Sequence, residues 1–193
     1  MGSIITRIIS TKIKKVNGVV MISTAYDNSL LYYLANKIVK ISLLFINHHA
    51  KANFFTKLLF KTPIYASAHS KTSFDWVTRD VAIVGKYLND PYCGYICTFS
   101  FYKDLTNLAY IASKKSVLLN TPKTLPLLIL GGTDDPIGGF SKAQNKLFNF
   151  YKRNHYTKVK KLLYKDCRHE LLNELNRNEI ISDIITWLTQ NTN

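Results

Sequence analysis

The sequence predicts an α/β fold in which parallel strands are joined and covered by helices. Helix-like and strand-like segments alternate along the 193 residues, and this order is typical of parallel sheets with crossover helices. The segment at residues 125–130 (LPLLIL) is apolar at every position, as expected for a strand covered on both faces. No internal repeat or linker divides the chain, so we expect a single domain over residues 1–193.

The first half of the chain is predicted to contain one helix, one strand and a long helical insertion. Residues 3–13 carry isoleucines at helical spacing, and residues 16–22 (VNGVVMI) form a β-branched run typical of a buried strand. Residues 25–119 have a mostly helical, aromatic-rich pattern with breaks at Pro63 and at residues 89–91. We expect this stretch to be a long helical insertion between two strands.

The second half is predicted to return to alternating strands and helices. After residues 125–130, a helix is expected over residues 138–153, with an apolar face formed by Ala143, Leu147, Phe148 and Tyr151. Residues 157–164 (TKVKKLLY) are a further strand candidate. The chain closes with an amphipathic helix over residues 171–189, which carries Leu172, Leu175, Ile180, Ile184 and Trp187.

The composition is that of a globular protein with a strong excess of positive charge. Hydrophobic residues make up 47% and charged residues 20% of the 22.1 kDa chain, which excludes a disordered protein. The net charge is +14, from 26 basic and 12 acidic residues, but only five of the basic residues are arginines. Because proteins that read nucleic acids depend on arginine for bidentate contacts, we expect no nucleic-acid partner. Two interpretations remain open, a generally lysine-rich composition and contact with an anionic lipid surface.

Cysteine content and hydropathy bear on the compartment of the protein. The three cysteines, Cys93, Cys97 and Cys167, are too few for a disulfide framework and have no metal-site spacing, so we expect a reduced, cytoplasmic environment. The most apolar stretch, residues 30–46, is interrupted by an asparagine and two lysines, and no secretory signal is evident. These features predict a protein that is soluble or at most peripheral to a membrane.

Polar residues suited to acid–base chemistry follow two of the predicted strands. Asp134 and Asp135 come after residues 125–130, and His169 comes after residues 157–164. Since the carboxyl ends of parallel strands meet at one edge of a sheet, an aspartate and a histidine placed there can form a carboxylate-oriented imidazole base. The alternative is structural, because an aspartate at such a place often caps a helix and a loop histidine often has no role.

Several segments resemble those of one family. Residues 132–138 (GTDDPIG) are similar to the G-x-x-D-P-V-G acid loop of the serine aminopeptidase-like branch of the α/β-hydrolase superfamily. Residues 168–174 (RHELLNE) are similar to its R-H-E-x-L-N-E histidine loop. This branch holds monoacylglycerol lipases and bacterial lysophospholipase-type esterases. Segments similar to cap signatures of the bacterial members lie at residues 74–76, 79–80, 90–94 and 101–105.

The resemblance implies the C-terminal part of an α/β-hydrolase fold, with a helical cap over residues 25–119 and a C-terminal core over residues 120–193. It implies that Asp135, which stands directly before Pro136, is the catalytic acid and that His169 is the base of a serine hydrolase. The implied substrate is a carboxylic ester of the lysophospholipid or monoacylglycerol type, hydrolysed without a metal or an organic cofactor.

The chain departs from this family at the nucleophile. None of its serines stands in the G-x-S-x-G pattern that holds the family's nucleophile. The first residues, Met1-Gly2-Ser3, fit the last three letters of the pattern G-H-S-M-G-S. The resemblance therefore places the nucleophilic serine immediately before Met1 and gives the Met1 backbone N–H the place of an oxyanion donor. We do not expect Ser3 to be a substitute nucleophile, because it lies in the first turn of the predicted helix.

This alignment predicts an N-terminally truncated chain that is inactive alone. A bare hydrophobic strand edge at residues 16–22 predicts poor solubility. Three alternatives stay open: an esterase completed by an upstream segment or by a separate N-terminal fragment in trans, a decayed remnant without activity, and a non-catalytic peripheral protein that binds anionic lipid.

Other residues of the chain are given more limited roles. We expect Cys167 to be a packing residue, and His48 and His49 to lie on the cap surface within a helical stretch. Six aromatic residues are candidates either for the core of the cap or for a hydrophobic lid over an acyl-chain pocket: Tyr32, Tyr33, Phe45, Phe54, Phe55 and Phe60.

Overall fold

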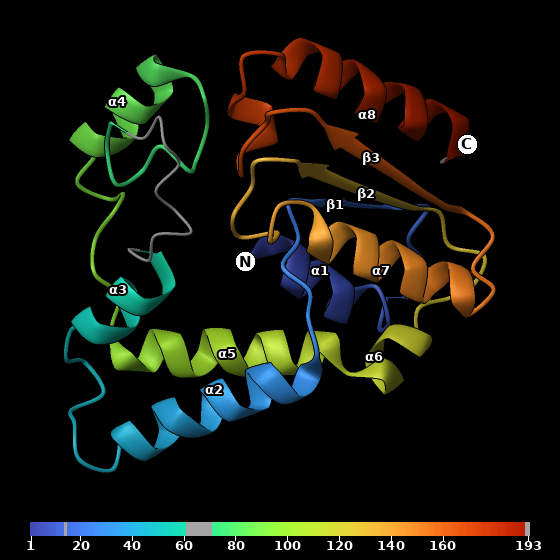
Figure 1. The fold of residues 1–193 in the computed structure, drawn as a ribbon. Helices are drawn as coiled ribbons and strands as arrows, with labels where there is room; N and C mark the ends of the chain where they lie inside the picture. Colours follow the sequence, from blue (N-terminus) through green and yellow to red (C-terminus); the bar gives the residue numbers. More distant parts are fainter. Residues whose placement is uncertain (14, 61–70, 192–193) are drawn as a thin grey trace.

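Three parallel strands and the helices around them form the body of the molecule (Figure 1). The computed structural model describes residues 1–13, 15–60 and 71–191, without the side chains of residues 58–60. Its elements are α1 (Gly2–Ile9), β1 (Val19–Ile22), α2 (Ser29–Ser42), α3 (Asn53–Phe60), α4 (Val81–Asn89), α5 (Phe99–Ser113), α6 (Lys115–Leu119), β2 (Leu127–Gly132), α7 (Lys142–Arg153), β3 (Val159–Tyr164), a 3-10 helix (Leu171–Asn173) and α8 (Arg177–Asn191). The predicted α/β fold and its alternation of strands and helices are confirmed.

Strand β2 lies at the centre of the sheet, between β1 and β3, and pairs in parallel with both. All six of its residues are buried, as its uninterrupted apolar run predicts. Successive side chains of a strand point to opposite faces, so β2 supplies two separate cores. Leu127 and Ile129 pack with α7, and Leu128 and Leu130 pack with α8. Figure 1 shows these two helices on opposite faces of the sheet.

Strand β1 forms one edge of the sheet that the described residues build. It is shorter than predicted, because only Val19–Ile22 pair with β2 while residues 16–18 approach the sheet as coil. The backbone of Val19 joins the sheet by donating its N–H to the Pro126 carbonyl.

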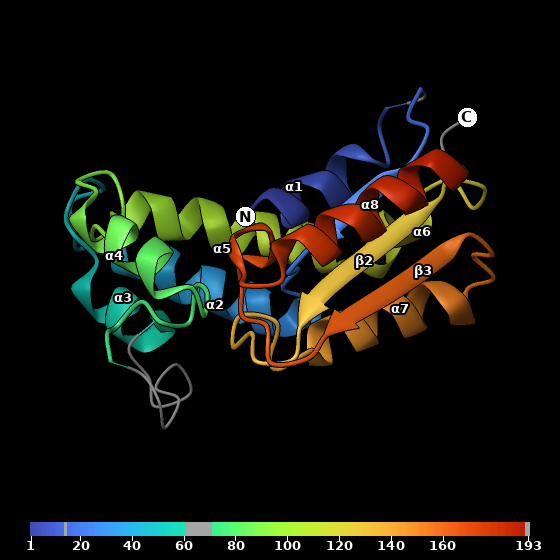
Figure 2. The same ribbon diagram turned by 90° about the horizontal axis from the view of Figure 1, so that it is seen from above.

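The helices α2 to α6 all lie between β1 and β2 in the sequence. Helix α2 packs along α5, where the buried Asn36 side chain donates to the Lys103 carbonyl (2.8 Å) and to the Thr106 hydroxyl (3.0 Å). Helix α5 in turn contacts α1, through a small cluster that contains Ile4, Ala109 and Ala112. Figures 1 and 2 both show α3 and α4 beyond the carboxyl ends of the strands.

Two helices begin later than the sequence predicts, for identifiable reasons. Helix α7 starts at Lys142 rather than at residue 138, because Phe140 and Ser141 adopt positive φ angles of 57° and 65° that a right-handed helix excludes. Helix α8 starts at Arg177 rather than at residue 171, because Glu174 is extended (ψ 163°) and its side chain is drawn into a buried polar network. Leu172 and Leu175, predicted on the apolar face of this helix, are consequently exposed.

Five of the six aromatic residues of the predicted cap have described side chains, and these five do not share one face. Tyr32 and Phe55 pack inward, whereas Tyr33, Phe45 and Phe54 are exposed. The expected helical setting of His48 and His49 is wrong, because both lie in the turn between α2 and α3. The break predicted at Pro63 and the side chain of Phe60 lie outside the described part of the chain.

Candidate active site

The loop after β2 holds one aspartate in a fully buried position. The Oδ1 atom of Asp135 accepts a hydrogen bond from the Ile137 N–H (2.9 Å), and its carbonyl accepts one from the Phe140 N–H (2.8 Å). These bonds curl the loop around the carboxylate, whose residue has no exposed surface. The neighbouring Asp134 is exposed and contributes only its backbone N–H, which donates to the Cys167 carbonyl.

Two glycines allow the chain to approach this carboxylate closely. A Cβ atom at Gly132 would lie 2.0 Å from the Cys167 carbonyl oxygen, so the end of β2 and the loop after β3 touch through their backbones. A Cβ atom at Gly138 would lie 3.0 Å from Oδ2 of Asp135 and 2.6 Å from the Gln144 amide nitrogen. A side chain at Gly132 would push the two loops apart, and one at Gly138 would overlap the Asp135 carboxylate and the Gln144 amide.

The loop after β3 brings His169 onto this aspartate. The Nδ1 atom of His169 lies 3.0 Å from Oδ1 of Asp135, across 34 residues of sequence. The imidazole is partly open, with 23% of its side-chain surface exposed, and the ring of Trp76 lies against it with ring centroids 5.6 Å apart. A buried carboxylate that accepts the Nδ1–H bond leaves Nε2 as the proton acceptor, which is the arrangement of a general base.

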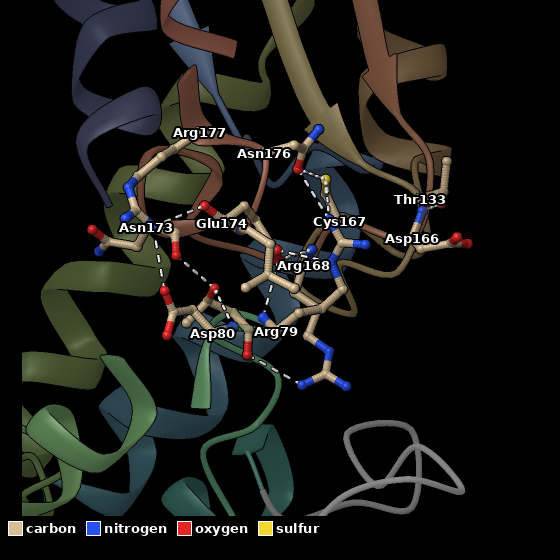
Figure 3. A network of polar contacts seen from close by, with 12 residues as sticks. Arg79, Asp80, Thr133, Asp166, Cys167, Arg168, Asn173, Glu174, Asn176 and Arg177 are labelled. Carbon is tan, nitrogen blue, oxygen red and sulfur yellow. Dashed lines mark hydrogen bonds and ion pairs between the residues drawn. The ribbon is translucent and has the colours of Figure 1, made fainter. Parts of the chain in front are cut away.

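A second polar network holds the histidine loop in place (Figure 3). Its centre is Glu174, which is completely buried and accepts hydrogen bonds from the Arg168 N–H (2.7 Å), the Arg79 N–H (3.2 Å) and the Arg79 guanidinium (2.8 Å). The family resemblance covers the segments that contain Arg79, Arg168 and Glu174, but it does not predict their mutual contacts. The only signal was their presence in the cap signature and in the histidine loop.

The remaining candidate residues are not joined to this pair by any hydrogen bond of the described structure. Ser3 lies in the first turn of α1, and Met1 precedes that helix and accepts the Ile4 N–H on its carbonyl (2.9 Å). Figure 1 shows this end of α1 at the same edge of the sheet as the two loops. Cys167 is buried beside Asn176, and burial raises the pKa of its thiol, which disfavours the thiolate that nucleophilic attack requires.

Over residues 1–13, 15–60 and 71–191, no three His, Cys, Asp or Glu side chains converge in a way that would hold a metal ion. None of the helices described there has the length and apolarity that crossing a bilayer requires. His69 lies outside these ranges.

Comparison with known proteins identifies the fold and the family model that fits the chain. A model of the serine aminopeptidase S33 family matches residues 1–176. A search of curated protein sequences finds no significant match.

Three solved structures illustrate the structural similarity. A thermostable carboxyl esterase from Bacillus coagulans superposes with a TM-score of 0.86 at 18% identity, over 99% of this chain and 62% of that one. A monoacylglycerol lipase from Paleococcus ferrophilus gives a TM-score of 0.68 at 19% identity, over 98% and 65%. A monoglyceride lipase from Saccharomyces cerevisiae gives 0.65 at 16% identity, over 99% and 59%. The chain therefore spans less than two thirds of the length of these three proteins.

Proposed function

Since the chain belongs to the serine aminopeptidase S33 family of α/β hydrolases, we propose that it supplies the acid and the base of a carboxylic ester hydrolase. The observation that carries the proposal is the 3.0 Å contact between Nδ1 of His169 and the buried carboxylate of Asp135. Both residues follow parallel strands at their carboxyl ends, where catalytic groups of open α/β sheets gather.

The proposed chemistry is two-step acyl transfer. Nε2 of His169 takes the proton of a serine hydroxyl as that oxygen attacks the ester carbonyl, and the Asp135 carboxylate stabilises the imidazolium that forms. The imidazolium then protonates the leaving alcohol. In the second step, Nε2 of His169 takes a proton from a water molecule, which attacks and hydrolyses the acyl-serine. The Met1 backbone amide is proposed as one oxyanion donor, on the grounds of family position alone.

The proposed nucleophile is a serine outside these 193 residues. No serine of the chain stands in G-x-S-x-G. We propose that the nucleophile is carried by a polypeptide segment that adds to the free edge of β1, either in the same chain or in trans. Within the described residues, β1 pairs with β2 alone. The backbone groups on its other edge can therefore accept a further parallel strand.

The proposed substrates are esters that carry a single acyl chain, namely monoacylglycerols or lysophospholipids. Two of the similar structures are lipases of monoglycerides by name. Residues 25–119 are proposed as the lid that covers the acyl chain. In the described part of this stretch, exposed apolar side chains such as Phe45 and Phe54 offer the hydrophobic surface that a lid over a lipid substrate needs.

A hydrolysis assay on two proteins tests the proposal. The chain alone is expected to cleave neither a short-chain nitrophenyl ester nor a monoacylglycerol faster than its His169→Ala variant does. A chimera that places the part of the Bacillus coagulans esterase not covered by this chain ahead of Met1 is expected to hydrolyse the nitrophenyl ester. His169→Ala should remove this activity.

Either of two results contradicts part of the proposal. Turnover by the chain alone that His169→Ala abolishes would show that the serine lies within the 193 residues. A chimera that folds, as judged by a cooperative thermal transition, and yet is inactive would argue against ester hydrolysis.

A second candidate function, peripheral binding to anionic lipid, is favoured by the outer face of α2. Leu30, Leu34, Ile38 and Ile41 follow one another at helical spacing, and each exposes about half of its surface or more. The buried residues of the helix, Asn36 and Val39, lie on the side that packs on α5. Figure 1 shows α2 on the outside of the molecule, with α5 between it and α1.

The stretch of sequence that contains this face carries only positive charges. The sequence contains no Asp or Glu over residues 28–74, and Lys37 and Lys40 are exposed on α2 itself. An amphipathic helix with an apolar stripe and flanking lysines suits the surface of a bilayer that contains anionic lipid. A second copy of the chain fits less well, because it would bring like charges together.

Vesicle flotation measures this binding. We expect the chain to float with vesicles that contain phosphatidylserine at low salt, and to be partly released at 0.5 M salt, because salt screens the lysine contribution. The double variant Leu34→Ser with Ile38→Ser should lose most of the binding. A matched double variant at two exposed leucines elsewhere, Leu172→Ser with Leu175→Ser, should keep it. Equal losses in both variants, or binding that ignores salt, would count against α2 as the lipid-binding face.

A further inference from the structure

The segment 75–79 of the helical insertion runs directly along the histidine loop. The N–H of His169 donates to the Trp76 carbonyl (3.3 Å), and the N–H of Glu170 donates to the Val77 carbonyl (2.7 Å). The histidine is thus held by the insertion through its backbone and through the Trp76 ring, and by the core through Asp135.

Side chains strengthen this pairing at both ends of the segment. The guanidinium of Arg168 donates to the carbonyls of Asp75 and Thr78, and the Thr78 hydroxyl donates to the Asn173 carbonyl (2.8 Å). Each of these bonds joins the segment 75–79 to the loop that carries His169. The loop is therefore in contact with the insertion on one side and with the end of the sheet on the other.

Arg79 joins the end of the segment 75–79 to the histidine loop through three contacts of its guanidinium (Figure 3). Its Nε atom donates to Oε2 of Glu174 (2.8 Å), and its Nη2 atom donates to Oδ1 of Asn176 (3.0 Å) and to Sγ of Cys167 (3.2 Å). All three partners belong to the histidine loop and the residues that follow it. A planar guanidinium suits this arrangement, because it offers donors in fixed directions.

Glu174 makes the contact strongly dependent on Arg79. The carboxylate is completely buried, and a buried charge that loses its ionic partner is costly, so the loop must rearrange to rehydrate it. Glu174 also accepts the N–H of Arg168, the residue directly before His169. A rearrangement at Glu174 is therefore transmitted to the histidine through one peptide unit.

We propose that Arg79 is a positioning residue for His169. Through Glu174 it fixes the histidine loop against the insertion, and so keeps Nδ1 of the imidazole on the Asp135 carboxylate. This role goes beyond the proposed ester hydrolysis, because it concerns the orientation and tautomer of His169 in the chain as it stands, whether or not a nucleophile is present.

Nitrogen-15 NMR of the histidine side chains tests this role without any turnover. In the wild-type chain, at a pH at which the spectrum shows no protonated imidazole, His169 is expected as the Nδ1–H tautomer. Its signal is assigned by comparison with His169→Gln. Arg79→Met keeps an unbranched apolar stem but removes the guanidinium. We expect it to lower the ratio of Nδ1–H to Nε2–H by roughly tenfold or more, as the hydrogen bond to Asp135 is lost.

Two further variants separate positioning from a general effect on stability. Arg177→Met removes an arginine at the exposed rim of the same network, which contacts Asp80 (3.3 Å) and the backbone carbonyl of Glu174 (3.3 Å), whereas Arg79 binds the Glu174 carboxylate. This variant should leave the His169 tautomer unchanged. Arg79→Lys keeps the charge opposite Glu174 and should restore a large part of the Nδ1–H form.

The outcomes that overturn the proposal are defined. A folded Arg79→Met chain that keeps the wild-type tautomer would show that Arg79 only stabilises the structure. A change of the same size in Arg177→Met would show that the network acts through net charge. If Arg79→Met does not fold, Glu174→Gln, which keeps the shape but not the charge of the partner, is measured in the same way, and an unchanged tautomer there rejects the proposal.

Discussion

Replacing Gly132 by alanine is expected to destabilise the chain by about 4 kcal/mol or more, which approaches the whole free energy of unfolding of many domains. The added Cβ would lie 2.0 Å from the Cys167 carbonyl oxygen and 2.6 Å from that of Arg168. Both atoms belong to backbone, so no side-chain rotation relieves the overlap. The loop that carries His169 would have to move away from β2, which breaks the bond between the Asp134 N–H and the Cys167 carbonyl. Urea unfolding followed by circular dichroism measures the effect.

A second glycine provides the control for this substitution. Gly85 lies inside α4, and a Cβ atom there would meet nothing within 4 Å. Gly85→Ala is therefore expected to stabilise the chain by roughly 0.5–1 kcal/mol, because alanine restricts the unfolded chain and favours the helix. If Gly132→Ala unfolds at the same urea concentration as the wild type, the close approach of the two loops is not present in solution.

The sheet could be predicted because its signal is local. Each residue of β2 is apolar, and an uninterrupted apolar run is the pattern expected of a strand that is buried on both faces. The placement of Asp135 and His169 followed from topology, since residues after neighbouring parallel strands meet at one edge. The aspartate that contacts His169 is the one before Pro136, and the turn explains this, because the Ile137 N–H binds Oδ1 of Asp135 from within the same loop.

Buried polar residues could not be predicted, because their partners are distant in sequence. Periodicity predicts Glu174 within an amphipathic helix, but its partner Arg79 lies 95 residues earlier in the sequence, and the helix begins only after Glu174, at Arg177. Arg7 is a similar case: it is almost completely buried in α1, although its charge predicts exposure. Its guanidinium donates to the Ala25 carbonyl (2.7 Å), and burial lowers its pKa. Helical spacing identifies a face, and tertiary contacts decide what that face is buried against.

The helical insertion contributes to the site as well as to its surroundings. Trp76 and Arg79 lie within the predicted cap, yet one contacts the His169 ring and backbone and the other binds the loop behind it. The imidazole therefore depends on two partners with separate roles. The insertion fixes the backbone of the loop, and Asp135 fixes the ring. Substitutions at the two partners should consequently produce different changes in the tautomer and in the activity of the site.

Asp135→Ala should reduce kcat of the active chimera by roughly 10⁴-fold, as expected for loss of the carboxylate of a catalytic triad. Removal of the carboxylate leaves Nδ1 of His169 without its acceptor and leaves the imidazolium without a counter-charge. The matched control is Asp134→Ala, which makes the same change one residue earlier. Because Asp134 is exposed and binds only through its backbone, kcat should stay within about twofold of the unsubstituted chimera. Similar losses in both variants would refute the assignment of Asp135 as the acid.

Asp135→Asn distinguishes the hydrogen bond of the carboxylate from its charge. The Ile137 N–H donates to Oδ1, the same atom that lies 3.0 Å from Nδ1 of His169. An asparagine that turned its NH₂ group toward the histidine would place two donors against each other, so the amide oxygen should stay at this position. We therefore expect His169 to keep its Nδ1–H tautomer in the NMR spectrum while kcat still falls, because the neutral amide cannot stabilise the imidazolium. A shift of the proton to Nε2 would mean that the Ile137 N–H does not fix the orientation of the side chain.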